Sequence, residues 1–319
     1  MTHLVDTMAY VGAVPWHGLG NALLVGQSID VWAKQAGMDW EVLEAPVCFM
    51  AKGSGHLNSV LPFPEHKVLY RSDTHAPLSV VSQRFKVVQP REILEFYRDL
   101  TELSGFKLET AGILKGGRKM WALARTGQAA ALKGNDVMKG YVLLATASDG
   151  TLATTAQFTS VRVVCNNTLT IALAGNTAAV KVPHSTEFDP VTVKQQLGIS
   201  VSAWDTFMYQ MKKLSERPVT SKEAMHYFTK IFAHPDNAPS GKTGERAMSQ
   251  AMALFEGQGK GAELPAAKNT AYGLLNAMTA FVDHERRAKS PDHRLDSAWF
   301  GEGARLKQKA LDQALLLIS

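Results

Sequence analysis

The sequence predicts an α+β fold, in which a twisted antiparallel sheet of hairpins is backed by helices and followed by a helical C-terminal segment. Two observations predict this class. Up to residue 183, short apolar runs alternate with glycine-containing turns, as in antiparallel hairpins. From Pro190 onward, apolar residues recur at helical spacing instead. We therefore expect an α+β core with basic β-hairpins over residues 1–183 and a mainly helical region over 184–319.

The core begins with a helix and a strand. Ser28 can cap a short helix that Gly37 ends. Residues 40–50 have the composition of a strand, in which Pro46 indicates an edge or a bulge. Residues 52–65 are rich in Gly, Ser and Pro, and they predict a loop.

A strand pair and a helix follow. Residues 67–71 and 78–81 flank a polar turn and predict two paired strands, and residues 84–88 predict a further basic strand. Pro90 is suited to the first turn of a helix, and Gly105 ends the apolar period that follows it.

Two hairpins complete the sheet. Both glycines of Lys115-Gly-Gly-Arg118 can adopt positive φ, which predicts a hairpin between residues 106–114 and 119–126. Asp149-Gly150 is the turn of a second hairpin over residues 140–164. The second strand of that hairpin carries one arginine, Arg162, which we expect a phosphate or a carboxylate across the sheet to satisfy.

The helical region contains several amphipathic segments. Thr220 and Glu223 form a capping box. The apolar side chains of residues 269–319 should pack either on the core or on another subunit. The expected helices span residues 191–216, 220–232, 246–255, 269–288 and 303–318.

Composition limits the function classes. The chain has 319 residues, 45% hydrophobic residues and a net charge of +5, which is typical of a globular protein. It has no evident membrane span or signal peptide. Cys48 and Cys165 lie in apolar surroundings and are expected to be reduced core residues, as in a cytoplasmic protein. Residues 66–133 hold 12 basic and six acidic side chains, which suggests an anionic partner or a solvated face.

The sequence does not indicate an enzyme, a metal or a cofactor. Residues 239–243 resemble the end of a phosphate-binding loop but lack its upstream glycine and strand. The histidines are dispersed, and His284 is expected at the surface. Cys165 could be a nucleophile if His17 approached it, but its apolar neighbours favour an inert side chain.

A nucleic-acid interface is the favoured interpretation of the basic block. Cations beside aromatic side chains are typical of surfaces that bind single strands. The alternative is that the aromatic residues are core and the cations only keep the protein in solution. The aromatic residues are Tyr70, Phe85, Phe106, Trp121 and Phe158. The candidate binding residues are Arg71, Arg84, Lys86, Lys115, Arg118, Lys119, Arg125, Arg162, Asn166 and Asn167.

Three blocks of sequence carry a family resemblance. They are Pro15-Trp16-His17-Gly18-Leu19-Gly20, the stretch from Gly140 to Ala174, and Asn269 to Asn276 together with Phe300-Gly301-Glu302-Gly303. In this order they resemble the laterally transferred phage/plasmid-like proteins of domain of unknown function 932. The resemblance implies a phage or plasmid setting and no settled activity.

A fold-level resemblance adds to this. The order of helices and hairpins over residues 28–182 is similar to that of phage single-strand annealing proteins. That resemblance implies assembly into rings or filaments and DNA laid along a basic groove.

We therefore expect a cytoplasmic protein that is not an enzyme, binds single-stranded DNA, self-associates and serves in annealing or recombination. The alternative is an accessory protein of a mobile element that acts on host defence or replication through protein contacts. A hydrolase or nuclease is disfavoured because carboxylates are not clustered.

Overall fold

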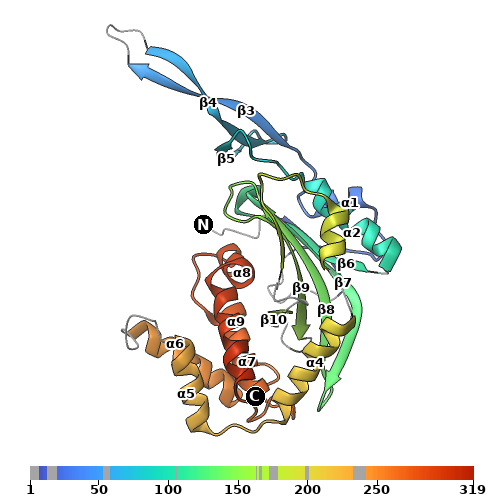
Figure 1. The fold of residues 1–319 in the computed structure, drawn as a ribbon, viewed down its shortest axis with the longest axis vertical. Helices are drawn as coiled ribbons and strands as arrows, with labels where there is room; N and C mark the ends of the chain where they lie inside the picture. The colour runs from blue at the N-terminus through green and yellow to red at the C-terminus, as the bar shows by residue number, and fades with distance from the viewer. Residues whose placement is uncertain are drawn as a thin grey trace.

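The computed structural model describes residues 7–12, 20–52, 58–104, 106–162, 164, 167–171, 179–197, 201–232 and 242–319. Figure 1 shows a large twisted sheet with helices on both of its faces and a long β-hairpin that projects from one end. The predicted α+β class, with an antiparallel sheet of hairpins and C-terminal helices, is confirmed.

The large sheet is built mainly from sequential antiparallel strands. Their order is β10-β9-β8-β7-β6-β1-β2. β10 pairs with residues 159–162 of β9, and β11 pairs with residues 154–156 of the same strand. The pair β1 and β2 is parallel. The strands are β1 (Thr7–Val11), β2 (Asn21–Leu23), β6 (Lys107–Leu114), β7 (Lys119–Leu132), β8 (Asp136–Ala147), β9 (Thr154–Arg162), β10 (Asn167–Thr170) and β11 (Val180–Val182).

Both predicted hairpin turns are confirmed. Gly116 and Gly117 have φ of 72° and 93° inside the turn η1 (Lys115–Gly117), which joins β6 to β7. Gly150 has φ of 70° between β8 and β9. Because side chains with a Cβ seldom adopt these angles, glycine at these positions fixes where each strand reverses.

A smaller sheet forms the projecting hairpin. Its strands are β3 (Val42–Lys52), β4 (Asn58–Arg71) and β5 (Pro77–Ser82), in that order. β5 pairs only with residues 66–70 of β4, so the outer half of the hairpin has two strands. The loop predicted over residues 52–65 is wrong for residues 58–65, because β4 runs through them and pairs with β3 past a bulge between Pro46 and Cys48, whereas residues 53–57 lie outside the described part.

The segment after β5 also differs from the prediction. Residues 84–88 do not form a strand. Instead, the Phe85 ring stacks on His184 with centroids 4.2 Å apart, and the Lys86 N–H donates to the His184 carbonyl over 2.6 Å. The segment is therefore held against the chain that follows β11, rather than against another strand.

One face of the large sheet is covered by helices from both halves of the chain. They are α1 (Ile29–Gln35), α2 (Pro90–Ser104), α3 (Pro190–Leu197) and α4 (Val201–Glu216). The buried Tyr97 hydroxyl of α2 donates to the carbonyls of Ala122 and Val142, 2.8 and 3.0 Å away. The ring centroids of Trp204 of α4 and Phe158 of β9 are 6.3 Å apart. The helix predicted over 191–216 corresponds to α3 and α4, and residues 198–200 between them lie outside the described part.

The C-terminal helices cover the opposite face (Figure 1). Trp299 packs edge-on against Trp121 of β7, with ring centroids 4.9 Å apart. The capping box is confirmed, since the Thr220 N–H donates to Glu223 and the Glu223 N–H to Thr220. A helix after Ser290 was not predicted, although Ser290 caps it and a proline follows. The helices are α5 (Ser221–Phe232), α6 (Lys242–Ala253), α7 (Ala271–Ala280), α8 (Pro291–Phe300) and α9 (Glu302–Leu315), with π-helical turns η2 (Leu254–Gln258) and η3 (Phe281–Glu285).

The two sequence regions share one hydrophobic core. Most buried side chains of the sheet, of α2 and of the C-terminal helices form one large cluster, and a smaller cluster around Trp121 and Leu143 packs against Leu295 of α8. The apolar side chains expected to pack on the core or on a subunit pack on the core, for example Leu274, Met278 and Leu311. The apolar faces of these helices are therefore buried within the protomer.

Candidate nucleic-acid interface

Most of the predicted binding residues come together at one end of the large sheet, beside the base of the projecting hairpin. Arg71 at the end of β4 donates to the Gly116 carbonyl of η1 over 3.3 Å. The Arg118 carbonyl accepts from the Ser148 N–H in the turn between β8 and β9 over 2.8 Å. That turn also contacts His184, whose Nε2 lies 3.0 Å from the Leu152 carbonyl oxygen.

These contacts connect separate segments into one surface. We call it the cationic end and define it as Arg71, Arg84, Lys86, Lys115, Arg118 and Lys119. Within the described part of the chain, the ion pairs of these six cations involve three carboxylates, namely Asp73, Glu187 and Asp296. The contacting groups therefore leave three positive charges in excess.

Arg71 stabilises the structure of the cationic end through its contacts. Its guanidinium donates to both carboxylate oxygens of Asp73, over 2.9 and 2.6 Å, and lies 4.3 Å from the centre of the Trp40 ring. The hydrogen bond from Arg71 lowers the pKa of Asp73 to about 2. Because the Arg71 side chain is only 14% exposed, most of its surface is committed to these contacts.

Two lysines at the turn between β6 and β7 share one carboxylate of α8. Lys115 donates to one oxygen of Asp296 over 2.6 Å, and Lys119 donates to the other. Burial alone would raise the pKa of Asp296, but the hydrogen bonds from the two lysines outweigh it and hold the pKa below its ordinary value. Lys119, a candidate binding residue from the sequence, is therefore buried against α8 and does not project into solvent.

The remaining cations of this end face solvent. Lys86 pairs with Glu187 over 3.2 Å, and both side chains are at least half exposed. Arg84 and Arg118 are exposed, and neither has a carboxylate partner in the described part of the chain. These three side chains can reach a bound anion without first breaking a buried contact.

Arg125 lies elsewhere on the sheet. It pairs across the strands with Lys107 and Tyr141, which places the three side chains on one face. Its nearest carboxylate is Glu109, at 3.9 Å. The Tyr141 hydroxyl donates to Glu109 over 2.8 Å, and burial together with that carboxylate raises the pKa of Tyr141. Arg125 is thus a half-exposed cation apart from the cationic end.

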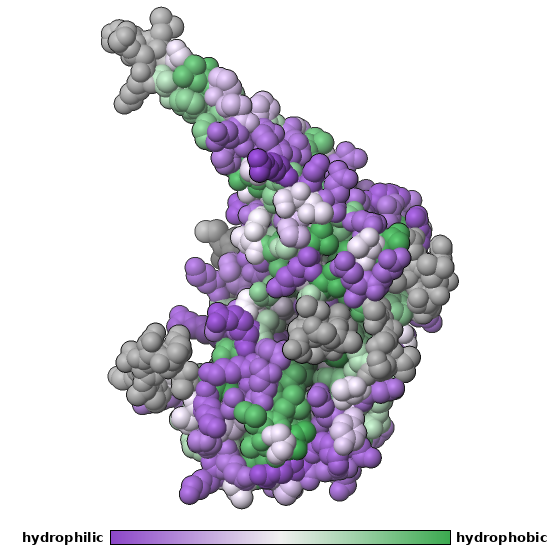
Figure 2. Space-filling model, in the orientation of Figure 1, coloured by the Kyte–Doolittle hydropathy of each residue, from purple (hydrophilic) through white to green (hydrophobic). Residues whose placement is uncertain are grey.

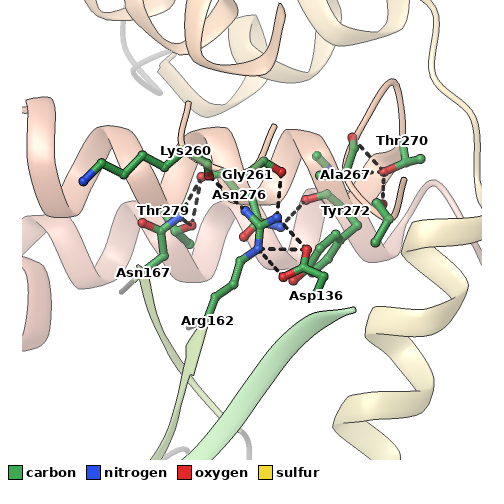
Figure 3. A network of polar contacts seen from close by, with 12 residues as sticks. Asp136, Arg162, Asn167, Lys260, Gly261, Ala267, Thr270, Tyr272, Asn276 and Thr279 are labelled. Atoms are coloured by element: carbon green, nitrogen blue, oxygen red, sulfur yellow. Dashed lines mark hydrogen bonds and ion pairs between the residues drawn. The ribbon is translucent and has the colours of Figure 1, made fainter. Parts of the chain in front are cut away.

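Arg162 is buried, and Figure 3 shows it among its polar partners. Its Nε lies 2.8 and 3.0 Å from the two Asp136 oxygens, and its Nη2 lies 2.5 Å from one of them. Nη2 also donates to the Gly261 carbonyl over 2.8 Å, and the Tyr272 ring lies 5.4 Å from the guanidinium carbon. The expected carboxylate across the sheet is confirmed. At 2% exposure, Arg162 offers no surface to a nucleic acid.

Asn167 belongs to the same buried region. Its amide donates to the Thr279 hydroxyl over 3.0 Å and to the Asn276 carbonyl over 3.2 Å. Its Oδ1 lies 3.1 Å from Nε2 of His284, so this histidine contacts β10 and is only partly exposed, unlike the surface residue that was expected. Asn166 lies outside the described residues, as do Cys165 and the block from Pro15 to Leu19.

A second buried ion pair, missed by the sequence analysis, fastens α9 to the sheet. Lys307 donates to Asp283 over 2.8 Å and to the Thr168 hydroxyl over 2.7 Å. The Thr168 N–H donates to the other Asp283 oxygen over 2.8 Å. Asn167 and Thr168 are therefore satisfied by side chains and a carbonyl of the C-terminal helices.

The aromatic residues do not provide the stacking surface that was expected. Phe85, Phe106, Trp121 and Phe158 are buried, and Tyr70 is partly buried. The alternative given for these residues, that they belong to the core, is the one the structure supports. A nucleic acid would therefore be held here mainly through its phosphates.

Metal binding and membrane spanning have no support in the described residues. These residues contain no group of three or more His, Cys, Asp or Glu side chains that could hold a metal ion. Among these residues, none of the helices combines the length and apolar character needed to cross a bilayer. Cys48, expected in the core, is an exposed free thiol on β3.

The fold and this surface define an α+β protein with a cationic end on a helix-covered sheet. A family model matches residues 77–299 and is described as Domain of unknown function (DUF932). The chain belongs to this family, as the motif blocks predicted. No curated protein and no solved structure matches the chain.

Proposed function

We propose that this protein binds single-stranded nucleic acid through the phosphates, at the cationic end. The observation that carries the proposal is the convergence of separate segments. The strand end at Arg71, the segment with Arg84 and Lys86, and the turn with Lys115 and Arg118 meet at one place. Their excess positive charge faces solvent where phosphates can approach.

The proposed mode follows from which groups are accessible. Exposed cations contact phosphates regardless of base, so binding should depend strongly on salt and little on sequence. We expect Arg84, Lys86 and Arg118 to contribute directly. Arg71 and Lys119 act by holding the surface together.

The test removes the two exposed arginines that have no acidic partner. Arg84→Ala/Arg118→Ala should weaken binding to a labelled single strand and reduce the salt slope by about 0.7 per lost contact, roughly 1.4 in all. The matched control is Lys222→Ala/Lys230→Ala, which removes the same charge from exposed positions on α5. Figure 1 places α5 at the end of the molecule opposite the hairpin.

Titrations at several salt concentrations, with a single strand and with a duplex, decide between the outcomes. An unchanged slope in the arginine variant, or an equal loss in the α5 variant, would remove the cationic end as the site. Stronger binding to the duplex would contradict the single-strand preference.

An annealing or recombination role in the cytoplasm, for a phage or plasmid, is the setting we propose for this binding. The second candidate is an accessory protein that acts through protein contacts. The apolar projecting hairpin favours it, because a surface for nucleic acid alone would not need apolar side chains in solvent.

A further inference from the structure

The outer half of the projecting hairpin exposes large apolar side chains. We call it the outer arm and define it as residues 48–51 of β3 and 59–64 of β4. Figure 2 shows apolar side chains along this part of the hairpin. The exposed fractions are 48% for Phe49, 73% for Met50, 66% for Val60, 43% for Leu61 and 41% for Phe63.

Apolar side chains lie on both faces of the outer arm. Met50 pairs with Val60 across the strands, and the adjacent pair, Phe49 with Leu61, points to the opposite face. A ribbon with one buried face would alternate apolar and polar residues. The unbroken apolar run from Val47 to Ala51 is instead typical of a strand covered on both sides.

The backbone of the outer arm is also incompletely paired. β3 is an edge strand, and β5 stops at residue 66 of β4, so both outer edges of residues 48–51 and 59–64 lack a neighbouring strand among the described residues. An isolated two-stranded hairpin is only marginally stable in water. Free edges with apolar faces pair readily with another chain.

The charge of this surface indicates its partner. No residue of the outer arm carries a charge. Two identical charged surfaces would repel, whereas two neutral apolar ribbons can meet about a two-fold axis without an unpaired charge. The absence of cations also separates the outer arm from the phosphate-binding surface at its base.

The exposed apolar area supplies a large share of what self-association needs. At roughly 200 Å² for each large residue, the five exposed fractions amount to about 500 Å² per copy. A stable complex buries roughly 800 Å² per partner, so these five side chains supply more than half of one side.

We propose that the outer arm is a self-association device, which pairs with the outer arm of a second copy of this chain. Residues of the two arms cover one another's apolar faces, and strand edges pair between copies. The C-terminal apolar stripes, buried in their own protomer, are not needed for this contact.

The test places charge on one cross-strand pair. Met50→Glu/Val60→Glu puts four like charges into a two-fold arm contact, and both side chains face solvent in the single chain, so folding should survive. The matched control is Leu24→Glu/Val25→Glu, because these residues are 77% and 75% exposed but lie after β2, away from the hairpin. Light scattering and sedimentation of the full chain, without nucleic acid, measure the mass.

We expect the wild type and the control to be dimers or larger assemblies at micromolar concentration, and the arm variant to be a folded monomer that still unfolds cooperatively. A monomeric wild type would overturn the proposal, and so would an assembly that the arm charges leave intact. Flotation of a monomeric wild type with neutral lipid vesicles, abolished by the arm charges, would assign the outer arm to a membrane surface instead. Since nucleic acid is absent throughout, these outcomes are independent of the proposed binding.

Discussion

Replacing Arg162 by methionine tests whether the most enclosed cation of the chain has a structural role. The Arg162 and Asp136 side chains are 2% and 0% exposed. Arg162→Met retains most of the apolar stem but leaves the Asp136 carboxylate buried without its cation. The Gly261 carbonyl loses its hydrogen bond from Nη2 as well.

The expected cost follows from this burial. Removing one partner of a buried ion pair costs about 3–5 kcal/mol, because the remaining charge is left uncompensated. Unfolding entropy of roughly 2 cal/mol/K per residue gives about 0.65 kcal/mol/K for this chain. The melting temperature should therefore fall by about 5 to 8 °C.

A second variant separates the effect of losing the ion pair from the effect of leaving one unpaired charge buried. Arg162→Met/Asp136→Leu removes both charges and should recover much of the lost stability. Thermal unfolding followed by circular dichroism measures both variants, and single-strand binding is measured well below the transition. An unchanged melting temperature together with lost binding would refute the structural role and make Arg162 a contact residue.

Two further predictions concern packing of the C-terminal helices. Because the pKa of Asp296 is lowered in the folded state, its carboxylate stabilises the fold above the ordinary Asp range, and that stability is lost as pH falls through the lowered pKa. Asp296→Asn should cost about 2 kcal/mol at neutral pH and progressively less in acid, and a constant difference in urea midpoint across pH would contradict this. A Cβ on Gly273 would lie 2.0 Å from the Ala267 carbonyl oxygen, so Gly273→Ala should destabilise by several kcal/mol. Gly244→Ala, in a helix with open space, should stabilise by about 0.5–1 kcal/mol, and similar melting shifts for both would refute the steric argument.

Local signals made part of the fold predictable. The turns at Gly116-Gly117 and Gly150 were found because positive φ is a property of single residues. The capping box at Thr220 is likewise encoded within four residues. The strand β4 could not be found this way. Pro62 and Pro64 indicate a loop locally, and only the pairing of β4 with β3 on either side of Pro64, at Pro62 and at Lys67, keeps this stretch in a strand.

The surface was predicted in composition but not in detail. The sequence indicates that residues 66–133 are basic, yet it does not show which cations are neutralised. Asp296 binds Lys119 from 177 positions away, and no local pattern connects the two. The ion-pair partner of Arg162 was easier to predict from the sequence. Its partner comes from the adjacent strand, where Asp136 is a diagonal neighbour two residues before its cross-strand partner Met138.

The cationic end and the outer arm are mechanically connected through one residue. Arg71 ends β4, binds the η1 turn at Gly116, and lies on the Trp40 ring just before β3. These contacts fix the direction of the hairpin relative to the large sheet. If two copies pair through their outer arms, the same contacts hold their cationic ends in a fixed relation. A strand bound at one end then meets the second at high effective concentration, so weak phosphate contacts can add up to firm binding without further contacts in either protomer.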